Sequence, residues 1–207
     1  MQKRIPTKLA IFDFDGTLTT RDTTFRFIFF YAGKMKAITA LVSIIPQLVL
    51  AKFGYLNMQA VKEKLFRNIF GGHAVAAVKL RGDEFGTNEI PLILHSIVYA
   101  EVKRLREDGF EILLLSASCR VWLNYWCRKE SIDLLCSEME EVDGFYTGNL
   151  LGRNCYGKAK VERLNEAYDL KKIREIYAYG NHRSDLYYMK LADKAFLVKG
   201  KKVLPYE

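Results

Sequence analysis

The sequence has 207 residues, half of them hydrophobic, and its 32 lysines and arginines exceed its 24 aspartates and glutamates, giving a formal net charge of +8. A chain of this length can form one core domain of ordinary size and a smaller module. The positive charge favours anionic partners, but it is spread along the chain without a basic block or a nucleic-acid-binding motif. We therefore expect a phosphorylated small molecule or an anionic membrane surface as partner, and no nucleic acid.

The N-terminal segment, MQKRIPTKLA, has no apolar region followed by a small-residue cleavage site, so it does not have the pattern of a secretory signal. The 4 cysteines contain no C-x-x-C pair, which favours reduced thiols without a metal or redox role. Together these features predict a cytoplasmic protein. They give no prediction of its oligomeric state.

The first predicted element is a strand over residues 9–12, LAIF, whose continuous apolar run is typical of a strand buried on both faces. Asp13, Asp15 and Gly16 follow it directly. Ligands of open α/β sheets bind beyond the carboxyl ends of the strands, so these two carboxylates fall where chemistry is normally done. Their mutual repulsion favours a bound divalent cation, a shared proton, or both. A simple Asp-Gly turn is the alternative, and the absence of a hairpin partner strand argues against it.

Residues 20–87 contain helical patterns and no strand pattern. Asp22 can cap the first helix, and Gly33 is positioned to end it. The predicted helices cover about residues 23–31, 57–70 and 74–85, with an apolar stretch between the first and the second.

That apolar stretch, residues 37–51, carries no charge and contains Pro46. Its 15 residues are fewer than the roughly 20 that a membrane-spanning helix needs. One interpretation is a buried helix that is kinked at Pro46. The other is an apolar wall, flanked by Lys34, Lys36 and Lys52, that rests on a membrane or holds a lipid tail, and it predicts peripheral membrane contact through the cap.

From residue 88 onward, helices and strands alternate, which is typical of a parallel sheet. One predicted helix begins at residue 88 or 89 and ends at Gly109, and a second follows the strand predicted at residues 111–115 and extends to about residue 128. A third covers residues 158–168, and a short fourth helix ends at Met189. The predicted strands cover residues 111–115, 173–179 and 195–198, and a hairpin covers residues 137–152. The sequence therefore predicts an α/β fold, a Rossmann-like parallel sheet flanked by helices. Its core domain comprises residues 1–19 and 88–207, and an all-helical cap domain, residues 20–87, is inserted after the first strand.

The segment Asp13-Phe14-Asp15-Gly16-Thr17-Leu18-Thr19 resembles the first motif of the haloacid dehalogenase superfamily. Three later segments resemble its other motifs, and they are Ser116-Ala117-Ser118, Cys155-Tyr156-Gly157-Lys158-Ala159-Lys160-Val161 and Gly180-Asn181-His182-Arg183-Ser184-Asp185. The likeness extends from residue 9 to about residue 197. It is closest to the phosphoserine-phosphatase-like branch, which carries a helical cap.

The resemblance implies a role for each matching residue. Asp13 corresponds to the nucleophile that becomes an aspartyl-phosphate, and Asp15 to the general acid and base. Ser116 corresponds to a phosphate-binding hydroxyl, with Ser118 as a weaker candidate that can instead cap a helix. Lys160 corresponds to the phosphate-binding lysine, and Lys158 is second choice.

The resemblance also implies Mg²⁺, bound by the Asp13 carboxylate, the backbone carbonyl of Asp15 and residue 181. The family has an acid at that last position, whereas this chain has Asn181. An amide oxygen can ligate a hard cation but brings no negative charge. Asp185 is expected to order metal-bound water or orient Lys160. The substitution at residue 181 leaves two outcomes open, which are weaker Mg²⁺ binding with activity and a catalytically weak protein that binds phosphate ligands.

Asp22 stands where phosphoserine phosphatases carry an acid that contacts the substrate's amine, so it is a candidate substrate contact as well as a helix cap.

The sequence as a whole predicts a Mg²⁺-dependent phosphatase that hydrolyses a phosphate monoester through an aspartyl-phosphate. The apolar cap stretch is similar to that of relatives that act on phosphatidylglycerophosphate, so a lipid phosphate is the alternative to a small phosphorylated metabolite. A response-regulator receiver is disfavoured because receivers carry no helical insertion of this length.

Overall fold

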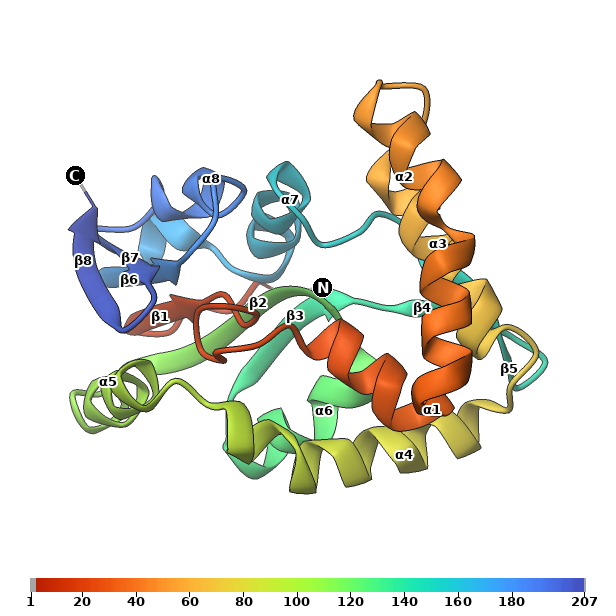
Figure 1. Ribbon diagram of the computed structural model, residues 1–207. Coiled ribbons are helices and arrows are strands. Elements are labelled where there is room, and N and C mark those ends of the chain that lie inside the picture. Colours follow the sequence, from red (N-terminus) through yellow and green to blue (C-terminus); the bar gives the residue numbers. More distant parts are fainter. Residues whose placement is uncertain (1–2, 207) are drawn as a thin grey trace.

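The computed structural model describes residues 3–206. A six-stranded sheet in the order β3-β2-β1-β6-β7-β8 forms the centre of the molecule (Figure 1). Neighbouring strands are parallel except for the last pair, β7 and β8, which is antiparallel. The strands are β1 (Lys8–Phe12), β2 (Glu111–Cys119), β3 (Asp133–Ser137), β6 (Glu175–Gly180), β7 (Lys194–Lys199) and β8 (Lys202–Tyr206). The predicted Rossmann-like α/β architecture is confirmed.

Strand β1 is buried on both faces, as its apolar run predicts. Leu9 and Ile11 belong to one hydrophobic cluster, Ala10 and Phe12 belong to the other, and all four side chains are fully buried. Because β1 lies between β2 and β6, the residues that follow it are surrounded by the carboxyl ends of its neighbours. This arrangement fixes the position of Asp13.

Helices cover the two faces of the sheet. Figure 1 shows α7 (Lys158–Ala167) and α8 (Leu186–Met189) on one face, and α5 (Ser96–Glu107) and α6 (Arg120–Lys129) on the other. Short 3₁₀ turns occur at Ile90–Ile93 and Leu170–Lys172. The four cysteines are buried with free thiols.

Between β1 and β2 the chain forms helices and no strand, apart from isolated β-bridges, which confirms the predicted helical insertion. Its cap helices are α1 (Thr23–Ser43), α2 (Ile45–Lys52), α3 (Met58–Phe70) and α4 (Val75–Asn88). The predicted hairpin forms a separate two-stranded sheet, β4 (Met139–Val142) and β5 (Phe145–Leu150). It packs against α3, where Gly148 lies so close to the Arg67 backbone that a side chain would not fit.

Three helices differ from the prediction. Gly33, with φ of 74°, kinks α1 but does not end it, because the helix resumes and continues to Ser43. Pro46 does not kink a continuous helix, because it lies in the first turn of the new helix α2, where its missing N–H costs no hydrogen bond. The predicted start of the next helix, at residue 88 or 89, is also wrong, whereas its end beside Gly109 agrees with the end of α5 at Glu107. Pro91 lies in a separate 3₁₀ turn, and α5 begins only at Ser96, capped by His95.

Strands β3 and β8 were not predicted, and β2 continues past its predicted end at residue 115 as far as Cys119. Strand β3 has three only partly buried residues, and β8 is an edge strand that contains Pro205, so neither carries a clear apolar signal. The extension of β2 matters most, because it brings Ser118 into the site.

By length and composition, the helical stretch Thr23–Lys52 is the one described segment that could cross a membrane. In the fold it is interrupted at Gly33 and at Ile44, between α1 and α2. Phe27 and Ile28, near its beginning, are fully buried in the main hydrophobic cluster. One face of its first turns is therefore packed into the interior of the protein.

Candidate active site

Asp13 directly follows β1, and its backbone N–H continues the ladder to β6 by donating to the carbonyl of Tyr179 at 2.9 Å. The residue is only 7% exposed. One carboxylate oxygen accepts a hydrogen bond from Lys160 Nζ at 2.6 Å, and the other accepts from the Thr17 hydroxyl at 3.2 Å. The carboxylate is therefore buried, paired and fixed in orientation at the carboxyl edge of the sheet.

Lys160 lies in the first turn of α7 and is 2% exposed. Its Nζ donates to Asp13 and also to Oδ1 of Asp185, at 2.8 Å. The second oxygen of Asp185 accepts the backbone N–H groups of Asn181 and His182, at 3.2 and 3.0 Å. The structure thus places Lys160 and Asp185 against Asp13, whereas the second-choice lysine, Lys158, is exposed.

Burial and charge pairing act in opposite directions within this ion triad. Burial raises the pKa of Asp13, and the neighbouring Lys160 partly offsets that rise. Burial by itself would lower the pKa of Lys160, but the carboxylates of Asp13 and Asp185 outweigh this effect and raise it. Lys160 consequently remains an ammonium ion and supplies the positive charge that the buried carboxylates require.

The Asp15 carboxylate is held by the start of the cap and by the end of β2. One oxygen accepts from the backbone N–H and the hydroxyl of Thr23, at 2.7 and 2.6 Å, and the other accepts from the Ser118 hydroxyl at 2.6 Å. Gly16, with φ of 80°, allows the sharp bend that turns the chain out of the sheet. The side chain of Asp15 therefore links the sheet edge to the first turn of α1.

The two serines of the second motif have different surroundings. Ser116 is fully buried, its Oγ accepts from the backbone N–H of Ser118 at 3.0 Å, and it does not line the cavity described below. Its phosphate-binding role stays a prediction. Ser118 lines the cavity and contacts Asp15, Thr23 and Thr24, and the N-terminus of α6 has no side-chain cap. The suggested capping role of Ser118 is therefore wrong.

Asn181 follows β6, and its amide nitrogen donates to the backbone carbonyl of Asp15 at 3.2 Å. The amide thus lies beside the carbonyl that the predicted metal site uses, and both residues line the same cavity as the Asp13 carboxylate. Rotation of the Asn181 amide would present its oxygen in place of its nitrogen. Together the three groups would form an all-oxygen donor set of the kind that Mg²⁺ binds, with one carboxylate among them. The donor set therefore fits the ion, with less negative charge than two acids would supply.

The sequence left two roles open for Asp22, a helix cap and a substrate contact. Its carboxylate caps α1 by accepting the backbone N–H of Phe25 at 3.0 Å, and it also lines the cavity. Burial raises the pKa of Asp22, and the nearby charge of Asp15 raises it further. The cap is shown, and the substrate contact stays a prediction.

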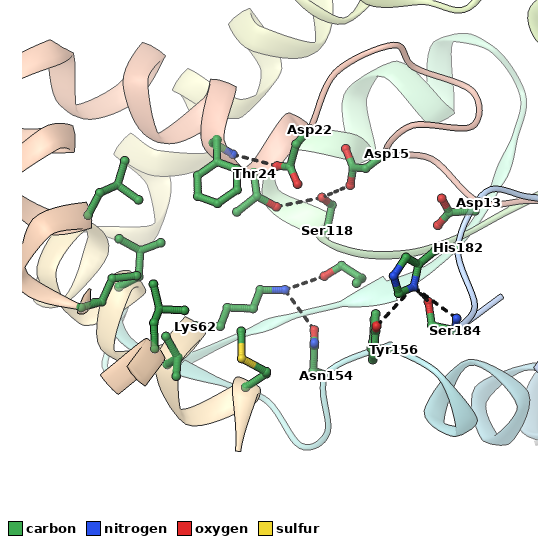
Figure 2. Close-up of a pocket in the computed structure, with 18 of the residues that line it drawn as sticks. Asp13, Asp15, Asp22, Thr24, Lys62, Ser118, Asn154, Tyr156, His182 and Ser184 are labelled. Carbon is green, nitrogen blue, oxygen red and sulfur yellow. Dashed lines mark hydrogen bonds between the residues drawn. The ribbon is translucent and has the colours of Figure 1, made fainter. Parts of the chain in front are cut away.

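A cavity of about 800 Å³ joins these polar groups to the cap helices (Figure 2). One end holds the carboxylates of Asp13, Asp15 and Asp22. At the other end, the wall is formed by apolar side chains of α1, α2, α3 and the junction between α1 and α2, namely Leu41, Val42, Ile44, Ile45, Leu48, Met58, Val61 and Leu65. The cavity is therefore amphipathic, with an ionic end and an apolar end.

Sequence reasoning missed Lys62, a cap residue on α3 that reaches into the cavity. Its Nζ donates to the carbonyl of Ala117 at 2.6 Å and to Asn154 Oδ1 at 2.9 Å (Figure 2). Among the described residues it has no ion pair with a carboxylate. Its position beside the buried Val61 and Leu65 was the available signal, because it put a cation at the border of an apolar helix face.

The family model of haloacid dehalogenase-like hydrolases matches residues 10–190. This chain belongs to that family. It is 30% identical over 192 residues to protein CicA of Caulobacter vibrioides (strain NA1000 / CB15N), covering 90% of this chain and 83% of that protein. In fold it resembles a protein of unknown function from Bordetella pertussis Tohama I, with a TM-score of 0.77 and 20% identity over 94% of this chain and 89% of the other. It also resembles a phosphoserine phosphohydrolase-like protein from Francisella tularensis, with a TM-score of 0.61 and 22% identity over 91% and 85% of the two chains.

Replacing Lys160 by methionine tests the ion triad. The substitution leaves two buried carboxylates without their cation, so we expect a loss of about 3–5 kcal/mol in the free energy of unfolding at neutral pH, measured by urea denaturation. It also removes the charge that lowers the pKa of Asp13, which then rises further. The folded variant therefore binds a proton on Asp13 more tightly than the unfolded chain does. The free energy of unfolding of the variant is consequently greatest near pH 4 and falls as the pH rises toward the raised pKa of Asp13.

Lys158→Met is the matched control, because Lys158 is in the same turn of α7 but exposed. Its stability should stay within about 0.5 kcal/mol of wild type. Equal stabilities of the Lys160→Met protein and wild type at neutral pH would contradict the ion triad.

Proposed function

We propose that this protein is a Mg²⁺-dependent phosphatase that hydrolyses a phosphate monoester through an aspartyl-phosphate on Asp13. The observation that supports this most directly is the buried Asp13 carboxylate, paired with Lys160 and facing the cavity. A carboxylate can attack phosphorus only where positive charge offsets its own charge and that of the phosphoryl group. The ammonium of Lys160 provides part of that charge.

In the first step, an Asp13 oxygen forms a bond to phosphorus while the bond to the leaving oxygen breaks, and Asp15 gives that oxygen a proton. In the second step, Asp15 takes a proton from water, the water oxygen bonds to phosphorus, and the bond from phosphorus to Asp13 breaks. The hydrogen bonds from Thr23 and Ser118 fix the direction in which Asp15 points. Two of its three donors belong to the cap helix α1, so the position of the cap governs the orientation of the acid.

Asp13, the Asp15 carbonyl and Asn181 would hold Mg²⁺. When bound, the ion supplies charge neutralisation at the phosphoryl oxygens. Because Asn181 contributes no charge, we expect weaker binding than with an acid at this position. That weakness is compatible with the alternative of a catalytically weak phosphate-binding protein.

The apolar end of the cavity favours a lipid phosphate over a small phosphorylated metabolite. A small polar substrate would leave the side chains of Leu41, Ile45 and Leu48 in contact with water, whereas an acyl or prenyl chain would bury them. Lys62 is available for a second anionic group between the phosphate and the chain. A phosphatidylglycerophosphate-type lipid has all three features.

The Asp13→Asn substitution tests the catalytic role. Because the amide is a poor nucleophile, we expect hydrolysis of an aryl phosphate in the presence of Mg²⁺ to fall about a thousandfold or more. The control is Asp83→Asn, which removes an exposed carboxylate of α4 and should leave the rate unchanged. Equal steady-state rates for Asp13→Asn and wild type would rule out the mechanism. In the same assay, a lipid phosphate should have a higher kcat/KM than small phosphorylated metabolites.

The Asn181→Asp substitution tests the metal site. Without Mg²⁺, the Tm should fall, because the hydrogen bond to the Asp15 carbonyl is lost and a carboxylate takes its place near Asp13. With saturating Mg²⁺, the variant should gain more in Tm than wild type, because the restored charge strengthens binding to the folded state. Asn88→Asp, at an exposed helix end, is the control. A variant that gains no more than wild type would contradict the assignment of Asn181 as a ligand, and activity that occurs only in Asn181→Asp would favour the binding-protein alternative.

A further inference from the structure

The end of the cap is unusually apolar for a surface. We define the cap tip as residues 34–57, which comprise the second half of α1, α2 and the loop that leads to α3. Figure 1 shows it projecting away from the sheet. None of the residues of α2 is buried. Six of its exposed apolar residues recur every three or four positions and form a stripe, in which each is between 40% and 78% exposed, and they are Met35, Ile38, Val42, Ile45, Val49 and Phe53.

This stripe lacks any cover within the described part of the chain. A short helix such as α2 has little stability of its own in water and normally depends on packing of an apolar face. Soluble monomers rarely expose long contiguous apolar patches, and those that exist usually mark interaction sites. The stripe therefore indicates a surface that is covered by a partner.

The charges around the tip indicate which partner. Residues 23–62 contain no aspartate or glutamate. Lys34, Lys36 and Lys52 are exposed, and none of them forms an ion pair within residues 3–206. Apolar side chains with lysines beside them and no acids complement an anionic bilayer, whose headgroups attract the cations while its interface takes up the apolar groups.

The tip is also continuous with the active-site cavity. Val42, Ile45, Leu48 and Met58 line the cavity and are at the same time between 40% and 60% exposed. Their side chains thus connect the apolar end of the cavity with the stripe. A molecule lying against the tip could extend into the cavity without crossing a polar surface.

The structure favours lying on the bilayer over crossing it. Phe27 and Ile28 are buried in the core, and Thr23 holds Asp15, so the beginning of this helical stretch cannot enter a bilayer while the site is intact. The part that remains available begins at Lys34, is bent at Ile44, and contains an uncharged run, residues 37–51, of only 15 residues. This run is shorter than the roughly 20 residues that a spanning helix needs.

We propose that the cap tip docks on the surface of an anionic membrane and turns the mouth of the cavity toward the lipids. A phosphate-bearing headgroup then enters toward Asp13 and Lys160, and its hydrocarbon chains remain against the tip. The docking stands independently of the proposed function. The identification of the docked lipid phosphate as the substrate rests on that function.

Co-sedimentation with vesicles tests the docking. Wild type should sediment with phosphatidylcholine vesicles that contain phosphatidylglycerol, sediment less with phosphatidylcholine alone, and dissociate as salt is raised. The double variant Val49→Glu/Phe53→Glu places two acids on exposed positions of the stripe that do not line the cavity. Its partition onto anionic vesicles should fall about tenfold or more. Leu80→Glu, an equally exposed position on α4 away from the tip, should sediment like wild type.

Failure of wild type to sediment with anionic vesicles would overturn the proposal, and so would full binding by the double variant. Analytical ultracentrifugation without vesicles tests whether a second copy of the chain covers the stripe instead. A wild type that self-associates, a double variant that is monomeric, and no vesicle binding by either would show that a second copy of the chain covers the stripe, which also overturns it. Hydrolysis of a soluble aryl phosphate separates the two proposals, because the double variant should keep the wild-type rate. Vesicle binding without any hydrolysis would contradict the phosphatase function and leave the docking intact.

Discussion

The ammonium group of Lys160, buried between the carboxylates of Asp13 and Asp185, is the interaction on which the site depends. Two carboxylates that are buried side by side need a cation or a shared proton, and in this site Lys160 supplies the cation. The sheet supplies the geometry. Strands β1 and β6 are parallel neighbours, so the residues that follow them meet at one edge, and α7 begins where it can direct its lysine to both. The buried strand β1 thus determines where the chemistry can occur.

The cap and the site are joined through Asp15. Its three hydrogen-bond donors come from Thr23 at the start of the cap and Ser118 at the end of β2, so the acid is in place only when α1 lies against the sheet edge. Farther along the same polypeptide, the cap exposes an apolar surface that continues into the cavity. One insertion therefore provides the orientation of the acid, the apolar wall and the membrane-docking surface that we propose.

Much of this arrangement could be predicted from the sequence, because the decisive residues are attached to strong local patterns. Asp13 and Asp15 follow an unmistakable buried strand, and Lys160 and Asp185 lie in segments that resemble family motifs. The features that were missed depend on distant contacts. Strand β3 forms only because β2 offers its edge, and the bond between Ser118 and Asp15 joins residues 103 positions apart. Lys62 belongs to the site only because its side chain reaches from α3 to the carbonyl of Ala117 on β2 and to Asn154 before α7.

The most direct measurement of the central claim is detection of the covalent intermediate. In an Asp15→Asn protein, an aryl phosphate can still transfer its phosphoryl group, because its leaving group needs little protonation, but hydrolysis of the intermediate is slowed. After incubation with Mg²⁺ and acid quenching, mass spectrometry of the peptide that contains Asp13 should show one added phosphoryl group on that residue. An unmodified Asp13, or a phosphoryl group on another residue, in a protein whose wild type hydrolyses the same substrate would contradict nucleophilic attack by Asp13.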